Sequence, residues 1–325
     1  MLNWKPFTGN SYDWDNITKQ FKENDFRQSF AWGEHLKYIG WKVERKQLIK
    51  DNYTNLIQYS LKKKWPIIAV YITGIDSNNL KYLSLLIDDL KYEYRNYFMY
   101  IRFDSHNKKS CESLSSLKFL KFKKTIYSIR ERHHSFVNLN NSHDEILKST
   151  KQKWRYNLKK AQKKPVVIEV VDQIDPDEIW NLSKDLSNFK NIKNLYTYKE
   201  LESYKKYLKE ITLIVRAKNM KNQIVGYYIC TIFNFNSFQI FNAVNKEGNS
   251  LLAGYATLMF IISELKKLGI QNLYLGELNK KRYPGNFQFK SSFNQKKFEV
   301  IGEYEYSSNL LIRLLFNFYL YIRNA

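Results

Sequence analysis

Residues 251–275 read LLAGYATLMFIISELKKLGIQNLYL. The first part, Leu251–Leu268, predicts a buried helix that Gly269 ends, and the short apolar run Ile270–Leu275 predicts a strand. Three further strands are predicted just before this helix, at residues 211–216, 223–233 and 238–243, separated by Asn-rich turns. Three strands in an antiparallel meander, then a helix and a strand, indicate an α+β fold with a mixed sheet flanked by helices.

The preceding sequence predicts a second unit of similar content. Strands are expected at residues 66–72, 97–103 and 125–139, with a helix at 80–94. In the later half a strand at 166–171 precedes a helix that begins at Asp175-Pro176 and a second helix at about 199–209. Since no linker rich in Gly, Pro or Ser separates them, we predict two halves, 1–140 and 141–325, that pack together.

Length and composition indicate a folded protein of a reducing compartment. The chain has 325 residues, of which 44% are hydrophobic, so it can form a packed core. Its two cysteines, Cys111 and Cys230, lack metal-ligand spacing, which argues against a disulfide scaffold and a zinc site. Neither a signal peptide nor an apolar run of about 18 residues is evident. We therefore expect a cytoplasmic protein, and a monomer.

The formal net charge of +22 favours anionic partners such as nucleic acid, nucleotide diphosphates or acidic lipid headgroups. Scattered lysines from an AT-rich coding sequence are an alternative explanation. The segment from Lys148 to Lys164 holds eight basic residues and no acid. We predict one helix here, begun by a capping box at Ser142 and Glu145 and ended by Pro165, which either attracts a polyanion or is simply solvated.

Several catalytic signatures are absent from the sequence. No histidine lies in an H-E-x-x-H pattern, and there is no G-x-S-x-G, P-loop or G-x-G-x-x-G motif. Neither cysteine has neighbours that would mark it as a low-pKa nucleophile. What remains suits direct transfer of an activated group between two bound substrates, with no covalent nucleophile and no metal.

The stretch Gly285–Phe293 reads GNFQFKSSF and places a lysine, Lys290, between two phenylalanines, Phe289 and Phe293. It follows the strand at 270–275. A lysine held in an apolar wall carries a poorly hydrated charge that suits an anionic or developing-negative oxygen. The alternative is a lysine at an exposed turn of a strand.

Several segments, in order along nearly the whole chain, resemble the FemABX family of aminoacyl (peptidyl) transferases. They match the family's Q-S-x-x-W start, a strand ending in an R-x-D-like pattern, an R-x-x-x-K-K-A helix, and an ending made of G-x-x-x-x-D-x-G and G-x-x-x-F-K-x-x-F-G. In this chain the matching residues are 28–33 with Gly40-Trp41, 101–104, 155–161, and 269–276 with 285–293.

The resemblance implies two GNAT-like halves, as in short members of the family that lack the coiled-coil arm. It also implies transfer of an amino acid from aminoacyl-tRNA, as co-substrate and with no further cofactor, to an amine of a peptidoglycan precursor or related surface glycan. The acceptor would be a nucleotide- or lipid-linked cell-envelope precursor. An alternative is acyl-CoA-dependent N-acylation of an amino sugar in surface-polysaccharide biosynthesis (O-antigen or capsule), and a third is a non-catalytic basic module that binds RNA or membrane.

The resemblance also implies roles for single residues. Lys290 would neutralise a phosphate or the developing oxyanion, and Phe289 would shape that pocket. Asp104 would accept the amine proton, with a pKa raised by burial, or would only cap a loop. Substrate binding is expected of Lys37, for a diphosphate, and of Arg155, for tRNA phosphates, although each could be a solvated helical side chain. Substrate binding is also expected of Phe293, Arg102 and Trp32. Arg102 could instead pair with Asp104, and Trp32 could instead belong to the core.

Some positions depart from the family pattern. Glu277 follows Leu275-Gly276, Asn294 replaces the final Gly, and Tyr71–Gly74 is a poor relative of the family's R-G-P segment. These departures leave the donor and the acceptor open. The last segment, Leu310–Arg323, is amphipathic and rich in aromatic residues. It is expected either to pack on its domain or to lie on an acidic membrane surface, which would make the protein membrane-peripheral.

Overall fold

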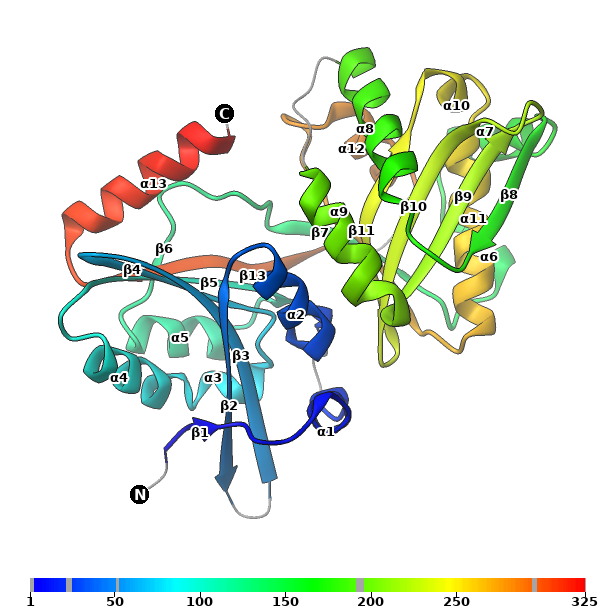
Figure 1. The fold of residues 1–325 in the computed structure, drawn as a ribbon. Helices are drawn as coiled ribbons and strands as arrows, with labels where there is room; N and C mark the ends of the chain where they lie inside the picture. Colours follow the sequence, from blue (N-terminus) through cyan, green and yellow to red (C-terminus); the bar gives the residue numbers. More distant parts are fainter. Residues whose placement is uncertain (1–2, 22–24, 51–52, 191–195, 294–296, 325) are drawn as a thin grey trace. The chain divides into compact units, whose positions relative to one another are not determined.

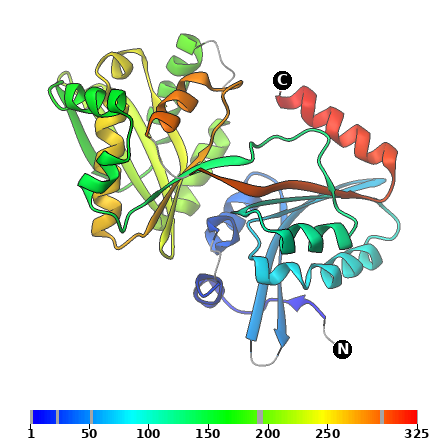
Figure 2. The same ribbon diagram turned by 180° about the vertical axis from the view of Figure 1, so that it is seen from behind.

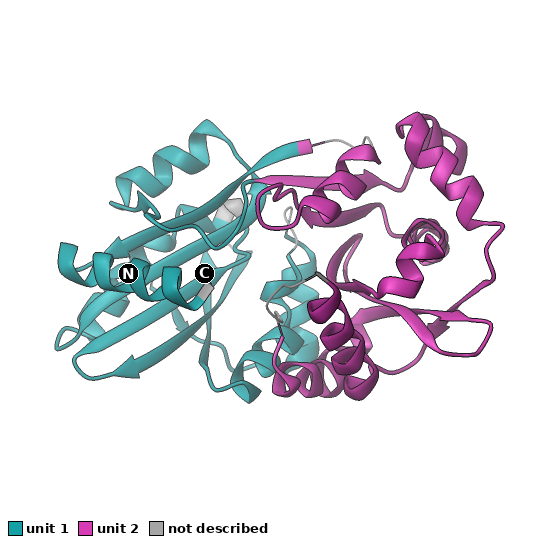
Figure 3. Cartoon of the chain, turned by 90° about the horizontal axis from the view of Figure 1, so that it is seen from above, with its two compact units in different colours: residues 1–132, 298–325 teal, residues 133–297 magenta. Residues whose placement is uncertain are grey.

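The computed structural model describes residues 3–21, 25–50, 53–190, 196–293 and 297–324. The chain forms two compact units (Figures 1 and 3). Unit 1 comprises residues 1–132 and 298–325, and unit 2 comprises residues 133–297. In the described part of the chain, no helix has the length and apolar character needed to cross a membrane.

The sheet of unit 1 has the strand order β1-β2-β3-β4-β5-β13, and β6 also pairs with β13. Neighbouring strands are antiparallel except for β4 and β5, which are parallel. The strands are β1 (Lys5–Pro6), β2 (Lys42–Lys50), β3 (Tyr53–Lys64), β4 (Ile67–Thr73), β5 (Phe98–Lys108), β6 (Lys123–Lys124) and β13 (Lys297–Ser307).

Strand β5 gives the sheet one apolar face and one polar face. Met99, Ile101 and Phe103 belong to the main core of the unit, where α4 packs with Leu83, Leu86, Ile87 and Leu90 at helical spacing. The alternate residues of β5, from Tyr100 to Asp104, lie on the other face because successive strand side chains point to opposite sides. The helices of unit 1 are α1 (Ser11–Lys19), α2 (Phe30–Tyr38), α3 (Ser77–Leu80), α4 (Leu83–Glu93), α5 (Cys111–Phe119) and α13 (Leu310–Asn324), with a 3₁₀ turn at Phe26–Gln28.

The sheet of unit 2 has the order β7-β12-β11-β10-β9-β8. All its pairs are antiparallel except β11 and β12. The strands are β7 (His133–Asn138), β8 (Val166–Val171), β9 (Thr212–Asn219), β10 (Ile224–Phe233), β11 (Asn236–Val244) and β12 (Asn272–Glu277). The predicted meander and the strand that follows the helix are therefore present, and the α+β prediction is confirmed.

Helices cover both faces of the unit 2 sheet (Figures 1 and 2). Helix α11 buries Leu258, Ile261, Ile262 and Leu265 in the core that it shares with α7, while α8 contacts β10 and β11. The helices are α6 (His143–Lys148), α7 (Gln152–Ala161), α8 (Pro176–Lys190), α9 (Tyr198–Ser203), α10 (Lys246–Ser250), α11 (Ala253–Lys267) and α12 (Pro284–Ser292). A π-helical turn at Tyr204–Leu208 and a 3₁₀ turn at Lys209–Ile211 continue α9.

Three sequence expectations differ from the structure. The basic segment is two helices, α6 and α7, because the chain is extended at Lys151. The long strand expected at 125–139 is confined to β7, His133–Asn138. The sequence division at 140 also assigned the C-terminus to the second half, whereas β13 pairs with β5 and so returns residues 298–325 to unit 1. Asn294 lies outside the described residues.

Candidate active site

Lys290 lies on a helix, α12, and not at the turn of a strand as the alternative expectation had it. Pro284 occupies the start of this helix, where its missing N–H costs no hydrogen bond and its fixed φ already suits the helix. Lys290 falls in the last turn and is the one residue of α12 classed as buried. Only 7% of its surface is exposed. The helix therefore holds a cation inside the unit.

The ammonium of Lys290 lies at the end of β12. Its Nζ donates to the main-chain oxygen of Glu277 over 3.3 Å. The pairing of β12 with β7 shifts register between Tyr274 and Gly276, where Gly276 adopts a φ of 79°, a left-handed value that favours glycine. Burial lowers the pKa of Lys290 to about 8, although the negative charge of Glu277 acts in the opposite direction and raises this pKa. At neutral pH the side chain is still mostly an ammonium.

Aromatic rings hold α12 in place. Phe293 is fully buried, with its ring centroid 4.7 Å from that of Trp154 on α7. Phe289 packs 5.1 Å from Tyr255 on α11 and 6.1 Å from Trp154. Asn157 also ties α7 to α11 through a 2.8 Å hydrogen bond to the Tyr255 hydroxyl. The two phenylalanines thus pack the helix on its neighbours, which fixes the direction of Lys290.

Strands β11 and β12 separate near this lysine. Their parallel pairing covers only Asn236–Phe238 against Asn272–Tyr274. Beyond that point β12 continues beside β7 as far as Glu277, and β11 continues beside β10 as far as Val244. The lysine is hydrogen-bonded to the end of the separating strand β12. Lys290, the Glu277 carbonyl and the aromatic wall together form the candidate site in unit 2.

Asp104 lies in unit 1 within a buried charge cluster. Its Oδ2 accepts from Nη1 of Arg27 at 2.6 Å and lies 3.4 Å from Nε of Arg130. Arg27 also donates Nη2 to Asp25 at 2.6 Å, and both Arg27 and Asp104 are buried. The guanidinium of Arg27 therefore lies between two carboxylates and pairs with both of them. Such pairing is required because an unpaired buried charge is strongly destabilising.

The electrostatics of Asp104 differ from the sequence expectation. Burial alone would raise the pKa of its carboxyl, but the charges of Arg27, His106 and Arg130 hold that pKa well below its ordinary range. The expected raised pKa is therefore wrong, and the carboxylate is a weaker base than the sequence suggested. Whether Asp104 accepts a proton stays a prediction.

Arg102 has a different partner from the one considered in the sequence. Its Nε donates to Oε1 of Glu303 on the neighbouring strand β13 at 2.9 Å, and its Nη2 donates to the carbonyl of Tyr127. Only 2% of Arg102 is exposed. The alternative Arg102–Asp104 pair is wrong, since Asp104 pairs with Arg27.

The other predicted binding residues have local partners. Lys37 is exposed and pairs with Glu34 one turn earlier on α2, at 2.8 Å. Trp32 is half-buried, with its ring edge-on to Phe26 at 5.0 Å. Arg155 donates Nη1 to the carbonyls of residues 147, 148 and 150. The first two are the last residues of α6, and the third lies in the short connection between α6 and α7. Each of these geometries is sufficient for a structural role.

The predicted residues thus fall into two groups. Lys290, Phe289, Phe293 and Arg155 belong to unit 2, and only the first three gather around α12. Asp104, Arg102, Lys37 and Trp32 belong to unit 1. Sequence reasoning missed Arg27, Asp25 and Glu303, although Arg27 directly precedes the Q-S segment that was noticed. It also missed Trp154 and Tyr255, which lie on the predicted helices but carry no motif of their own.

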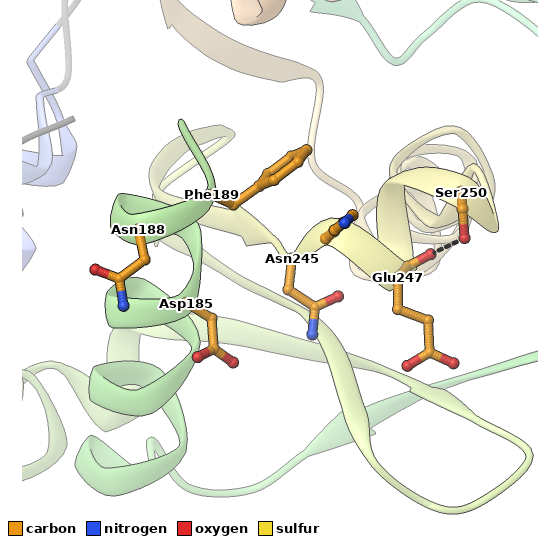
Figure 4. Close-up of a pocket in the computed structure, with 7 residues that line it drawn as sticks. Asp185, Asn188, Phe189, Asn245, Glu247 and Ser250 are labelled. Carbon is orange, nitrogen blue, oxygen red and sulfur yellow. Dashed lines mark hydrogen bonds between the residues drawn. The ribbon is translucent and has the colours of Figure 1, made fainter. Parts of the chain in front are cut away.

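Unit 2 also has an open hollow of about 760 Å³ between the end of α8 and α10 (Figure 4). Its lining mixes acidic, amide and aromatic side chains with one lysine, and none of the predicted residues belongs to it. The lining residues are Asp185, Asn188, Phe189, Asn245, Lys246, Glu247 and Ser250. Among the described side chains, no group of three or more His, Cys, Asp or Glu is arranged to hold a metal ion.

Comparison with family models and with curated proteins finds no match. Solved structures do match. FemX has a TM-score of 0.80 at 16% identity, over 96% of this chain and 100% of its own. A tandem GNAT protein from the clavulanic acid biosynthesis pathway has a TM-score of 0.59 at 8% identity, over 95% and 99%. The C-terminal domain assigned to a lysylphosphatidylglycerol synthetase from Agrobacterium fabrum has a TM-score of 0.58 at 12% identity, over 94% and 95%.

These likenesses define the class of the fold: two GNAT-like α+β units in one chain. The particular version is the FemX fold, which covers nearly the whole chain. The FemABX resemblance is confirmed at the level of the fold. At sequence identities of 16% and below, these likenesses establish the fold and do not establish an activity.

Proposed function

We propose that the protein is an aminoacyltransferase that moves an amino acid from aminoacyl-tRNA to an amine of a peptidoglycan precursor or related surface glycan. The observation that carries the proposal is Lys290, a buried ammonium whose Nζ is hydrogen-bonded to the Glu277 carbonyl. It occupies the F-K position of the family-like ending, in a chain with the FemX fold. The name of the lysylphosphatidylglycerol synthetase also links a related fold to an aminoacylated envelope molecule.

The reaction requires a developing negative charge to be stabilised. The acceptor amine attacks the ester carbonyl of the charged tRNA, forming a C–N bond and a tetrahedral oxyanion. The C–O ester bond then breaks, the amine loses a proton, and the ribose oxygen of the tRNA gains one. In a poorly hydrated site a fixed ammonium stabilises the oxyanion more strongly than it would in water. Lys290 suits this role because its helix is held by packed rings and needs no rearrangement.

The exposed lysines of unit 2 support a polyanionic donor. On α7 the residues Trp154, Leu158 and Ala161 face the core, and the lysines of this helix are exposed. Further exposed lysines precede and follow the helix, at Lys151, Lys163 and Lys164. A helix with one apolar and one strongly basic face attracts phosphates with little dependence on sequence.

The test is an acceptor-mass assay. The protein is incubated with a charged tRNA mixture or with acetyl-CoA, together with UDP-linked and lipid-linked peptidoglycan precursors and amino sugars, and the acceptor masses are followed. Transfer from charged tRNA that Lys290→Met abolishes, and that Lys267→Met leaves intact, supports the proposal. Lys267 is a suitable control because it is an exposed lysine of the same unit, paired with Glu264.

Other outcomes are equally informative. Transfer from acetyl-CoA to an amino sugar would replace the proposal by acyl-CoA-dependent N-acylation. Activity that survives Lys290→Met would remove the lysine from the mechanism. Retention of the variant's fold is checked by circular dichroism, so that loss of activity is not loss of structure.

A further inference from the structure

Helix α13 is held on unit 1 by its polar and aromatic side chains. Arg313 donates Nε to Oε1 of Glu305 on β13 at 2.6 Å, and Asn317 donates Nδ2 to Oε2 of the same residue at 2.7 Å. Phe316 stacks on Tyr100 of β5 with a centroid separation of 4.3 Å. Glu305 is only 1% exposed, so its carboxylate is strongly bound from two sides. This anchoring fixes which face of the helix turns outward.

The outward face is continuous and apolar. Leu311, Leu314, Leu315, Phe318 and Ile322 follow helical spacing and have exposed fractions between 48% and 65%. Leu310, Tyr319 and Tyr321 extend the same surface, with 55% or more exposed. Soluble proteins rarely leave an apolar patch of several hundred Å² uncovered, and such patches mark interaction sites with proteins or membranes. We name these eight residues the outer face of α13.

Basic residues border this face. Arg313 donates Nη2 to the carbonyl of Lys124 at 2.9 Å, which places β6 with its two exposed lysines, Lys123 and Lys124, beside the helix. Tyr127 lies edge-on to Tyr321 at 5.6 Å, and the nearby Ile126 is 54% exposed. Neither residues 310–324 nor residues 123–130 contain an Asp or Glu. The apolar surface therefore has a positive rim.

We propose that the outer face of α13 docks the protein on an anionic lipid bilayer, with the lysines of β6 at the headgroups. An amphipathic helix lying in the interface buries its apolar face at the headgroup boundary, and its basic flank is attracted to acidic lipid. Tyrosines at the edge of the face suit the same depth. The charge of the rim argues for a bilayer rather than for a second copy of this chain, because a second copy would bring an equally basic rim against it. The proposal does not depend on the proposed reaction.

The test is flotation of the full chain with vesicles of phosphatidylcholine alone or with 30% phosphatidylglycerol. Binding to the anionic vesicles is expected. The triple substitution Leu311→Ser, Leu314→Ser, Phe318→Ser should weaken it by about 1000-fold or more, since each large side chain buried in lipid contributes about tenfold or more. The matched control, Ile49→Ser, Tyr53→Ser, Phe119→Ser, also removes three exposed large side chains of unit 1 and should leave binding unchanged.

The role of charge is tested separately. Lys123→Gln with Lys124→Gln should weaken binding to the anionic vesicles by about 25-fold, or about fivefold for each lysine. Lys5→Gln with Lys50→Gln removes two exposed lysines at the opposite edge of the same sheet and should have no effect.

Absence of binding to the anionic vesicles would overturn the proposal, as would equal binding to the neutral ones. So would binding that the outer-face substitutions leave at the level of the control. Dimerisation in analytical ultracentrifugation that the same substitutions abolish, without vesicle binding, would assign the face to a second copy instead.

Discussion

Replacing Lys290 by methionine is expected to stabilise the protein while abolishing transfer. Lysine and methionine have similar unbranched shapes, so the substitution removes the charge with little change in packed volume. Lys290 is 7% exposed, and its ammonium is poorly solvated at every pH at which it is charged. A residue retained at a cost in stability is expected where function requires it.

The magnitude follows from the pKa of Lys290. Burial lowers this pKa from the ordinary 10.5 to about 8. The difference of roughly 2.5, at about 1.36 kcal/mol per pKa unit, corresponds to about 3.4 kcal/mol of free energy of unfolding. Below pH 8 both the folded and the unfolded state hold the proton, so the cost of the buried charge is fully present. Between pH 8 and 10.5 the folded state loses its proton first, the cost shrinks, and stability rises relative to a variant without the amine.

The assay is urea denaturation of the wild type and of Lys290→Met at pH 7 and pH 9.5, followed by circular dichroism. The advantage of the variant should be about 3 kcal/mol at pH 7 and about 1.4 kcal/mol at pH 9.5. Lys267→Met, at an exposed position, is the control and should show no such advantage at either pH. A variant no more stable than the wild type at pH 7, or an advantage independent of pH, would refute the reasoning.

Three further predictions concern the charged side chains. Arg27→Met should lower the free energy of unfolding by about 3–5 kcal/mol in urea denaturation, because it leaves the buried carboxylates of Asp25 and Asp104 without their shared cation. Unchanged stability would contradict the buried cluster. Arg155→Ala should cost about 1–3 kcal/mol in the same assay, because the carbonyl of the buried Thr150 loses the guanidinium that donates to it. A loss of tRNA affinity without a loss of stability would instead favour a phosphate contact for Arg155. Finally, the transfer rate should fall as pH rises through about 8, where Lys290 loses its charge, and a rate that kept rising to pH 10 would exclude the ammonium.

Local signals predicted much of the fold. The capping box at Ser142 and Glu145 is present, with the Ser142 side chain accepting from the Glu145 N–H. Asp175 accepts from the N–H groups of Asp177 and Glu178 at the start of α8, as an N-cap does. The turns at 219–222 and 234–237 separate antiparallel strands as expected. These features depend on residues a few positions apart, which a sequence pattern can reveal.

Features that depend on distant residues were not predictable in the same way. Strand β13 returns to unit 1 by pairing with β5 about 200 residues earlier. The sequence of neither strand indicates that the other is its partner. At the break between α6 and α7, Arg155 donates to the carbonyls of Lys148 and Thr150, a contact that the residue pattern of this segment does not reveal. The partners of Asp104 could not be identified for the same reason, since Arg27 lies 77 positions away.

The candidate site was predicted in part. The sequence indicated a lysine between two phenylalanines, and the structure places Phe289 and Phe293 against Trp154 with Lys290 buried beside them. What it did not indicate was the helix, although Pro284 stands at its first position. Periodicity is difficult to read in nine residues that hold three phenylalanines and a lysine.

The most direct test of the central claim is the acceptor mass after incubation with charged tRNA, measured for the wild type and for Lys290→Met side by side. The account predicts that the wild type adds one aminoacyl mass to an amine-bearing envelope precursor, and that the folded variant adds none. Equal transfer by the two proteins, or transfer from acetyl-CoA alone, would contradict it.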